Sequence, residues 1–300
     1  MFLFASVSSP IGQLPHRGSL LNTNQQQSEA WNGPESVHFV DHADRYDRQL
    51  APFADALFER VQLEPRHSVL DVGCGCGATT IAAARDARGA LGVDISKPLL
   101  EVAADRARAG SVDNVEFVVA DAQTYAFAEA AFDIIISQFG LMFFDNPMAA
   151  FANLRRALAP GGRVAFVCWQ GLDANEWVSV VARAVAHYVA LPDLGWQAGG
   201  PGMFALKDPS ETTALLDAAG FTQTEIEPIS PTIILGGGGT LDESIDFLLG
   251  TGIARGLLGR VEPDARAEAI EAVRGSLAER YVSGLGVRLG TGGWLVSARK

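Results

Sequence analysis

A glycine-rich stretch, HSVLDVGCGCGATTIAAARD at residues 67–86, constrains this chain more than any other feature. It begins with a short apolar run, continues through Gly73, Gly75 and Gly77, and ends in an alanine-rich segment with helical spacing. A buried strand that passes through a glycine loop into a helix is typical of the first unit of a doubly wound α/β sheet. The stretch therefore predicts an α/β fold with a ligand against the glycine loop.

The rest of the chain repeats this alternation of strand and helix. Short apolar strands are expected at 68–73, 89–96, 114–122, 132–140 and 163–169, and two more at 221–230 and 286–299. Amphipathic helices between them predict a Rossmann-like, doubly wound, mostly parallel seven-stranded sheet with helices on both faces. N-terminal helices at 32–63 and a helical insert at 241–281 are expected to be added to it. In such sheets ligands bind beyond the carboxyl ends of the strands.

Charge and cysteine content limit which binding partners and which cellular compartment suit this chain. The net charge of -12 argues against nucleic acid and anionic membrane, which an acidic chain does not attract. No apolar run is long enough for a membrane span. The three cysteines, Cys74, Cys76 and Cys168, are a sparse, odd set that suits a reducing compartment. We therefore expect a cytoplasmic protein that acts on a small molecule, and the sequence leaves a homodimer open.

The glycine loop fits two ligand patterns. Gly73, Gly75 and Ala78 satisfy the dinucleotide pattern G-x-G-x-x-G/A, which is weak on its own. Asp71 also stands two residues before the alternating glycines, where it is placed to bind an ammonium group and would repel a pyrophosphate. This favours a ligand without phosphate. A nicotinamide-dependent oxidoreductase stays open as the alternative.

Two further acids follow the next strands. Asp94 ends the second strand, where its carboxylate is placed to accept hydrogen bonds from both hydroxyls of a ribose. Asp121 ends the third strand, where it is placed to accept one from an exocyclic adenine amine. With the glycine loop and the LAPGG of Leu158–Gly162, these acids resemble the pattern of the class I S-adenosylmethionine-dependent methyltransferases. The similarity is greatest to the small-molecule branch that includes the ubiquinone and menaquinone methyltransferases.

The resemblance implies S-adenosyl-L-methionine as methyl donor and S-adenosyl-L-homocysteine as product. The glycine loop would surround the methionine part, Ile95 would pack on the adenine ring, and Tyr46 would close over the site. The cofactor-binding residues implied in this way are Tyr46, Asp71, Gly73, Cys74, Gly75, Asp94, Ile95, Asp121, Ala122 and Gln138.

The acceptor is expected to be small and hydrophobic, of an aromatic, polyketide-like or quinone-like kind. Aromatic side chains in the loops after the fourth and fifth strands are most simply core packing, but half of them are expected to line the acceptor pocket. The residues assigned to this pocket are His38, Phe139, Met142, Phe143, Trp169 and Phe204.

Catalytic groups are less clearly marked. His38 and His42 lie four residues apart and share a face if their segment is helical, where a surface or cap role is the plainer interpretation. A zinc site would need further ligands, and Cys74-x-Cys76 offers only half of one, so we expect no metal ion. His42 and Asp145 are the candidates for polar assistance. Because no base is unambiguous, a non-catalytic S-adenosylmethionine-binding protein stays open as a third reading.

One domain is expected over residues 28–300, after a disordered leader at 1–27 that is rich in Gln, Asn and Ser. Its core is expected at about 64–170, and the elements that hold or cover the acceptor at about 28–63, 171–210 and 240–285.

Overall fold

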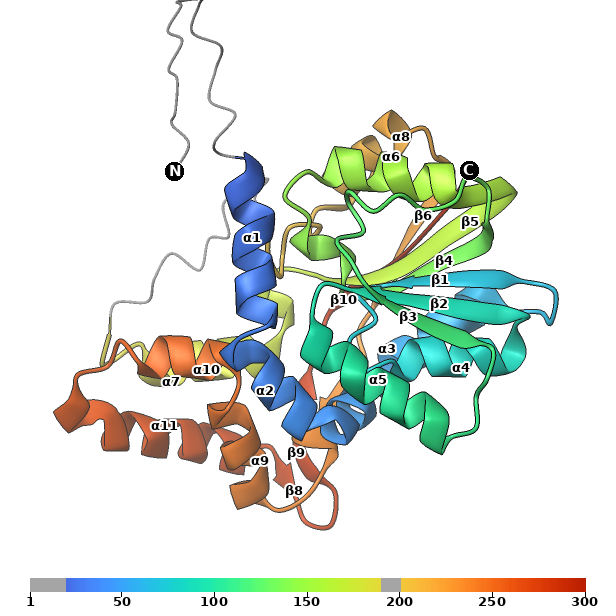
Figure 1. Cartoon of the computed structure of the whole chain (residues 1–300). Helices are drawn as coiled ribbons and strands as arrows, with labels where there is room; N and C mark the ends of the chain where they lie inside the picture. The colour runs from blue at the N-terminus through green and yellow to red at the C-terminus, as the bar shows by residue number, and fades with distance from the viewer. Residues whose placement is uncertain (1–19, 190–200) are drawn as a thin grey trace, which may run out of the picture.

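The computed structural model describes residues 20–189 and 201–300, and its centre is a seven-stranded sheet (Figure 1). The strand order is β3-β2-β1-β4-β5-β10-β6. The pairs from β3 to β5 are parallel, whereas β10 runs antiparallel to both β5 and β6. The doubly wound, mostly parallel sheet expected from the sequence is confirmed. Its strands are β1 (Ser68–Val72), β2 (Gly89–Asp94), β3 (Val115–Val119), β4 (Phe132–Gln138), β5 (Leu158–Trp169), β6 (Thr222–Ile229) and β10 (Gly293–Arg299).

Helices cover both faces of this sheet (Figure 1). A parallel strand that is covered on both sides reads as a continuous apolar run, and Ile134, Ile135 and Ile136 of β4 are fully buried in this way. On one face lie α3 (Ala43–Val61), α4 (Ala78–Asp86) and α5 (Lys97–Ala109), and on the other α6 (Pro147–Ala157) and α8 (Pro209–Ala218).

A second group of elements packs beside the sheet, below α1 in Figure 1. It contains α7 (Glu176–Val185), α9 (Leu241–Leu249), α10 (Gly252–Leu258) and α11 (Arg266–Ala278). With them is a three-stranded sheet of β7 (Thr232–Ile234), β9 (Gly286–Gly290) and β8 (Tyr281–Val282). The helical insert is confirmed as α9 to α11. The expected final strand is two strands in different sheets, β9 and β10, and α7 was not anticipated within 171–210. Residues 190–200 of that connection lie outside the described residues.

The N-terminal helices α1 (Leu20–Trp31) and α2 (Pro34–Asp41) precede α3. Helix α1 begins at Leu20, inside the segment expected as a leader. Its last residue, Trp31, and the next residue, Asn32, contact the loops after β4 and β2. Residues 1–19 of the expected leader lie outside the described residues. No helix in the described part of the chain is long and apolar enough to cross a membrane.

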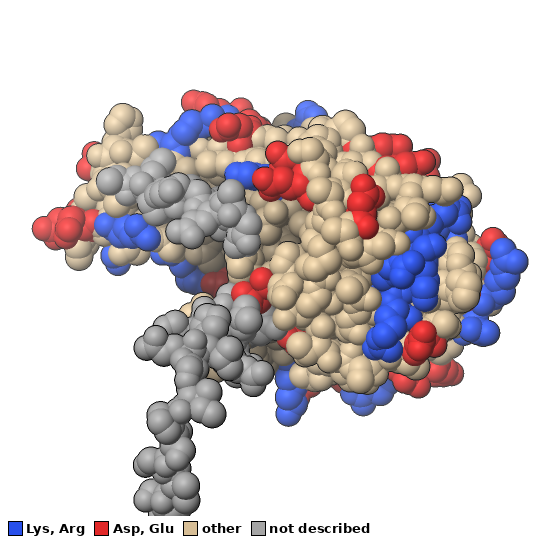
Figure 2. All heavy atoms as spheres, turned by 90° about the horizontal axis from the view of Figure 1, so that it is seen from above, with Lys and Arg blue, Asp and Glu red and all other residues tan. Residues whose placement is uncertain are grey.

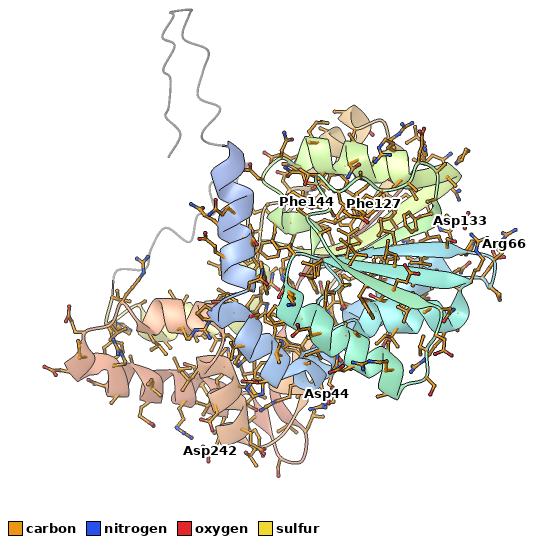
Figure 3. The ribbon with its side chains drawn as sticks, viewed as in Figure 1. Asp44, Arg66, Phe127, Asp133, Phe144 and Asp242 are labelled. Carbon is orange, nitrogen blue, oxygen red and sulfur yellow. The ribbon has the colours of Figure 1, made fainter. Side chains whose placement is uncertain are left out.

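The carboxyl ends of β1 to β5 point toward α1. Arg66 and Asp133 flank the amino ends of β1 and β4, and both lie on the opposite side of the molecule (Figure 3). The functional site expected beyond the carboxyl ends thus faces α1, α2 and the second group of elements.

Candidate functional site

Backbone N–H groups of the loop between β1 and α4 hold this loop against the neighbouring strand β2. Gly73 and Cys74 donate their N–H groups to the carbonyl oxygen of Val93, at 2.8 and 3.3 Å. Gly75 donates its N–H to Oδ2 of Asp94, at 2.9 Å. These three amides are therefore engaged within the protein and are not offered to a phosphate group. The loop instead leaves space, because a Cβ added to Gly75 would meet no atom within 4 Å.

Asp71 lies beneath this loop and is fully buried. Its Oδ2 accepts hydrogen bonds from the hydroxyls of Thr79 and Thr80, at 2.6 and 2.7 Å, while its Oδ1 has no hydrogen-bond partner. Burial raises the pKa of Asp71 to about 6, although the two hydroxyls act in the opposite direction. A buried carboxylate oxygen without a protein donor fits a ligand that brings an ammonium group.

Asp94 stands at the end of the neighbouring strand. Besides the bond from Gly75, its Oδ1 accepts a hydrogen bond from the N–H of Ser96, at 2.8 Å. Burial raises the pKa of this carboxyl against the lowering effect of the backbone donors. Each carboxylate oxygen has a further lone pair for a ligand hydroxyl. One strand further, Asp121 accepts a hydrogen bond from the N–H of Gln123, at 2.9 Å, and Ala122 beside it is buried. The three acids thus follow adjacent strands, as the sequence predicts.

The end of β4 carries an aromatic platform. Phe139 has a φ of +62°, which is rare for a bulky residue, and its ring stacks on Trp169 with 3.9 Å between centroids. Phe53 meets both rings edge-on. The preceding residue, Gln138, donates its Nε2–H to the carbonyl oxygen of Leu50 in α3, at 2.9 Å. Phe139 thus has a strained backbone conformation at the carboxyl end of β4, and such strain is concentrated at functional sites.

A cluster of polar and aromatic rings lies on the N-terminal helices α2 and α3. Tyr46 stacks on Phe39 with 3.9 Å between centroids, and its hydroxyl hydrogen-bonds Nδ1 of His38 at 2.9 Å. Burial raises the pKa of Tyr46 and lowers the pKa of His38 to about 4, so both are neutral at pH 7. The rings of His38 and His42 lie 4.5 Å apart. They do not share one helix, since His42 ends α2 and begins α3 with non-helical dihedral angles, but they still meet.

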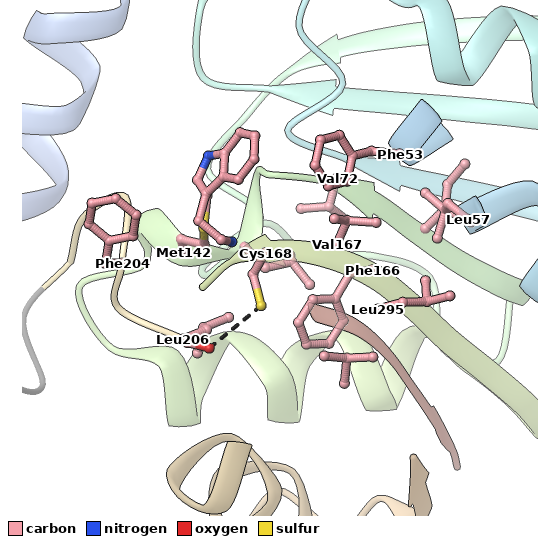
Figure 4. Packing of buried hydrophobic residues seen from close by; sticks show 14 of the residues in the cluster. Phe53, Leu57, Val72, Met142, Phe166, Val167, Cys168, Phe204, Leu206 and Leu295 are labelled. Atoms are coloured by element: carbon pink, nitrogen blue, oxygen red, sulfur yellow. Dashed lines mark hydrogen bonds between the residues drawn. The ribbon is translucent and has the colours of Figure 1, made fainter. Parts of the chain in front are cut away.

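The other expected acceptor-pocket residues are divided between core and edge. Met142 and Phe204 are almost fully buried (Figure 4), and Met142 Sδ accepts a hydrogen bond from the N–H of Trp169 at 3.4 Å. Their place in the pocket stays a prediction. Phe143 is half-buried and meets Trp31 edge-on at 5.6 Å. Met142 also borders a cavity of about 200 Å³, which Phe144 lines from the α6 side of the sheet (Figure 3).

The candidate catalytic and metal-binding residues are placed as follows. Asp145 Oδ2 is buried and has no hydrogen-bond partner. Cys74 is buried, and Cys76 lies with its Sγ 4.0 Å from the carbonyl oxygen of Phe39, where burial raises its pKa to about 12. Within 20–189 and 201–300, no three His, Cys, Asp or Glu residues come together as metal ligands.

Several residues at this edge were missed by sequence reasoning. Ser137 donates its hydroxyl hydrogen to the carbonyl oxygen of Val72 at 2.6 Å, which ties the end of β4 to the end of β1. Thr79 and Thr80 could have been identified from their position directly after the glycine loop. Asn32, which contacts the loop after β2, has no signal of its own in the sequence.

Comparisons with known proteins agree with this geometry. Residues 69–162 match the model of a methyltransferase domain. Methyltransferase GfsG of Streptomyces halstedii is 31% identical over 196 residues, which cover 61% of this chain and 68% of GfsG. Aklanonic acid methyltransferase DauC of Streptomyces sp. strain C5 is 34% identical over 147 residues, covering 47% of this chain and 67% of DauC. The crystal structure of YcgJ from Bacillus subtilis shares the fold, with a TM-score of 0.54, 20% identity, and coverage of 82% of this chain and 97% of YcgJ.

Proposed function

This chain belongs to the class I S-adenosylmethionine-dependent methyltransferases that act on small molecules, and we propose that it methylates a hydrophobic, aromatic or polyketide-like acceptor by direct in-line transfer. The observation that carries the choice of acceptor is the platform of Phe139 on Trp169, which lies at the carboxyl ends of β4 and β5. A relative named for aklanonic acid supports a small organic acceptor. Because the sulfonium already activates the methyl group, alignment of the acceptor with the methyl–sulfur bond is what the site must supply.

The glycine loop and the acids fit the cofactor. S-adenosylmethionine supplies a methyl group that its sulfonium already activates. We propose that Asp71 Oδ1 receives the ammonium group and that the open side of Gly75 holds the methionine part, next to Gly73, Cys74 and Gln138. Asp94 would hold the ribose hydroxyls, because its two oxygens are already oriented by backbone N–H groups. The adenine ring would then lie between Ile95 and the Asp121–Ala122 edge.

The proton chemistry depends on the acceptor. An acceptor that is anionic at neutral pH needs no base, whereas a hydroxyl or an acidic carbon needs one. His42 and Asp145 are our candidates, and Asp145 is favoured by its buried oxygen without a hydrogen-bond partner. Tyr46 and His38, which are neutral and hydrogen-bonded to each other, would close the acceptor side and exclude water.

The alternatives are less well supported. A nicotinamide dinucleotide would place its pyrophosphate against amides that Val93 and Asp94 already occupy. A purely binding role would not require the buried carboxylate oxygen at Asp145.

We further infer a cytoplasmic location and no nucleic-acid partner. The net charge of -12 supports this, as do the free thiols Cys74, Cys76 and Cys168. On the face shown in Figure 2, Lys and Arg side chains gather toward one edge with Asp and Glu close by. A homodimer, which the sequence leaves open, is tested by the mass of the chain in solution.

Transfer of an isotope-labelled methyl group tests the proposed reaction. The purified chain is incubated with methyl-labelled S-adenosylmethionine and a panel of aromatic, polyketide and quinone acceptors, with a nucleic acid and a charged amine as comparison acceptors, and the products are analysed by mass spectrometry. We expect label in at least one hydrophobic acceptor and stoichiometric S-adenosylhomocysteine, with loss of turnover but not of cofactor binding in Asp145→Asn. Label only in a nucleic acid or in a charged acceptor would contradict the proposal.

Gly75→Ala is expected to weaken cofactor binding by filling the space at the glycine loop, beyond the effect of backbone strain on stability. The φ of Gly75 is +53°, so alanine costs about 1 kcal/mol of folding stability, and its methyl group enters the space left for the methionine part. Gly161→Ala is the matched control, because Gly161 also has a positive φ (+76°) and no atom within 4 Å of an added Cβ. The melting temperature should fall by a similar amount in both variants, whereas calorimetry should show about tenfold weaker cofactor binding in Gly75→Ala alone. Equal affinities would contradict the assignment of the space.

Cofactor affinity is expected to rise between pH 5 and pH 7. Burial raises the pKa of Asp71 to about 6, so below that pH the site holds a proton that a bound ammonium group must displace. Each pH unit below the pKa then costs about tenfold in affinity, so binding at pH 5 should be about tenfold weaker than at pH 7. Calorimetry across this range checks the result, and Asp71→Asn should remove most of the dependence. Affinity that does not vary with pH in the wild type would exclude contact between Asp71 and the ammonium group.

A further inference from the structure

The turn between α1 and α2 contacts the loops after two different strands. Asn32 donates its Nδ2–H to the carbonyl oxygen of Ile95 at 3.0 Å, and its Oδ1 accepts a hydrogen bond from the N–H of Lys97 at 3.0 Å. Ile95 lies in the loop from β2 to α5, and Lys97 is the first residue of α5. The neighbouring residue, Trp31, meets Phe143 edge-on, with 5.6 Å between the ring centroids. Phe143 follows β4.

The strand order shows which part of the sheet this turn covers. In the sheet, β1 lies between β2 and β4. A turn that touches the loops after both outer strands must therefore cross the carboxyl end of β1, where the glycine loop lies. The helix that follows continues along the loop, since the carbonyl oxygen of Phe39 lies 4.0 Å from Sγ of Cys76. The turn, residues 31–33, thus forms a strap over the candidate cofactor site.

Helix α2, which directly follows the strap, is attached to the second group of elements. Glu35 forms an ion pair with Arg255 of α10, at 2.7 Å. The backbone there is in close contact with α2, because an added Cβ on Gly250 would collide with the ring of His38 and one on Gly252 with the carboxylate of Glu35. Movement of the strap away from the sheet must therefore also loosen the contact between α2 and α10.

We propose that this strap gates the exchange of cofactor and product, and that Asn32 is the residue that latches it. The proposal rests on the proposed function of the site, since it assumes that S-adenosylmethionine and S-adenosylhomocysteine occupy it. The latch joins only protein atoms, so its two hydrogen bonds stabilise the closed strap whether or not a ligand is bound. Loss of the latch is therefore expected to speed ligand entry and ligand release by similar factors. The dissociation constant should change little, because it is the ratio of the two rates.

Stopped-flow kinetics of S-adenosylhomocysteine binding and displacement test the latch in the full chain. In Asn32→Ala we expect both rate constants to rise roughly five- to hundredfold, the range that two neutral hydrogen bonds support, with an almost unchanged dissociation constant. Trp31→Ala should act in the same direction. Gln25→Ala is the matched control, because Gln25 lies on α1 away from the turn and its side chain donates a hydrogen bond to Glu29 of the same helix at 2.9 Å.

A plainer role for Asn32 is to cap the first turn of α5 through Lys97. In that case Asn32→Ala would lower the melting temperature and leave both rate constants as in the wild type, which would overturn the proposal. A higher dissociation constant with an unchanged association rate would also overturn it, because it would show a damaged binding surface and not an open gate. If the wild type binds no S-adenosylhomocysteine at all, the proposed function fails instead.

Discussion

Asp94→Ala is expected to weaken S-adenosylmethionine binding about a hundred- to thousandfold, because two charge-assisted hydrogen bonds to the ribose are lost together. The same substitution removes the acceptor for the N–H of Gly75, so the glycine loop keeps only its hydrogen bonds to Val93 as links to β2 among the described residues. Both effects act on the cofactor and not on the acceptor. Isothermal titration calorimetry with S-adenosylmethionine measures the change directly.

Asp113→Ala is the matched control for this substitution. Asp113 is an exposed acid in the turn before β3, and its removal changes the net charge by the same amount. Its cofactor affinity should equal that of the wild type. Wild-type affinity in a folded Asp94→Ala would show that the ribose does not lie at the end of β2.

Gly140→Ala is expected to cost about 3 kcal/mol of unfolding free energy and to abolish cofactor binding. An added Cβ would lie 2.5 Å from the carbonyl oxygen of Val72 and 2.9 Å from the Cα of Gly73. Both are backbone atoms of the β1 end and its loop, so neither can move aside without shifting the glycine loop. The added Cβ would also lie 2.9 Å from Oγ of Ser137, which accepts a hydrogen bond from the N–H of Gly140 at 3.2 Å, so this hydrogen bond is disturbed as well. Urea unfolding followed by calorimetry measures both effects.

Gly171→Ala separates this steric effect from a general effect of losing glycine. Gly171 follows β5, has a φ of -61°, and would meet no atom within 4 Å of an added Cβ. Its unfolding free energy should stay within about 0.5 kcal/mol of the wild type. A Gly140→Ala variant that is equally stable would contradict the close packing of the β1 and β4 loops.

The sheet could be predicted from the sequence because its signals are local. A parallel strand covered on both faces reads as a run of apolar residues, and Ile134, Ile135 and Ile136 show this directly. The acids at the strand ends were equally visible, since Asp94 and Asp121 interrupt apolar runs at the positions where a ligand would be bound. The helical insert at 241–281 could also be recognised from its periodicity.

Other elements depend on contacts that are distant in the sequence. The final strand was predicted as one because 286–299 has a continuous β pattern, yet β9 pairs with β7 and β8 while β10 joins the main sheet. Helix α7 is amphipathic, with Glu176, Ser179 and Arg183 on one face, but the Gly- and Pro-rich sequence after it favoured the interpretation of 171–210 as a connection. Helix α1 is polar, and nothing in its composition indicates that Trp31 and Asn32 anchor its end to loops more than sixty residues away.

At the site, the sequence indicated which residues gather but not how each is used. It marked Asp71 as a ligand-binding acid, and the structure shows that one of its oxygens is already held by Thr79 and Thr80. It placed His38 and His42 on one helix face, whereas a break between two helices brings the rings together. Such details depend on tertiary packing, which a pattern of residue types does not encode.

The central claim is that the glycine loop and the three acids hold S-adenosylmethionine, and calorimetric titration of the wild-type chain tests it most directly. The chain is titrated separately with S-adenosylmethionine, S-adenosylhomocysteine and NAD. We expect both sulfur ligands to bind at one site per chain and NAD to give no binding heat. Binding of NAD without a response to either sulfur ligand would contradict the account.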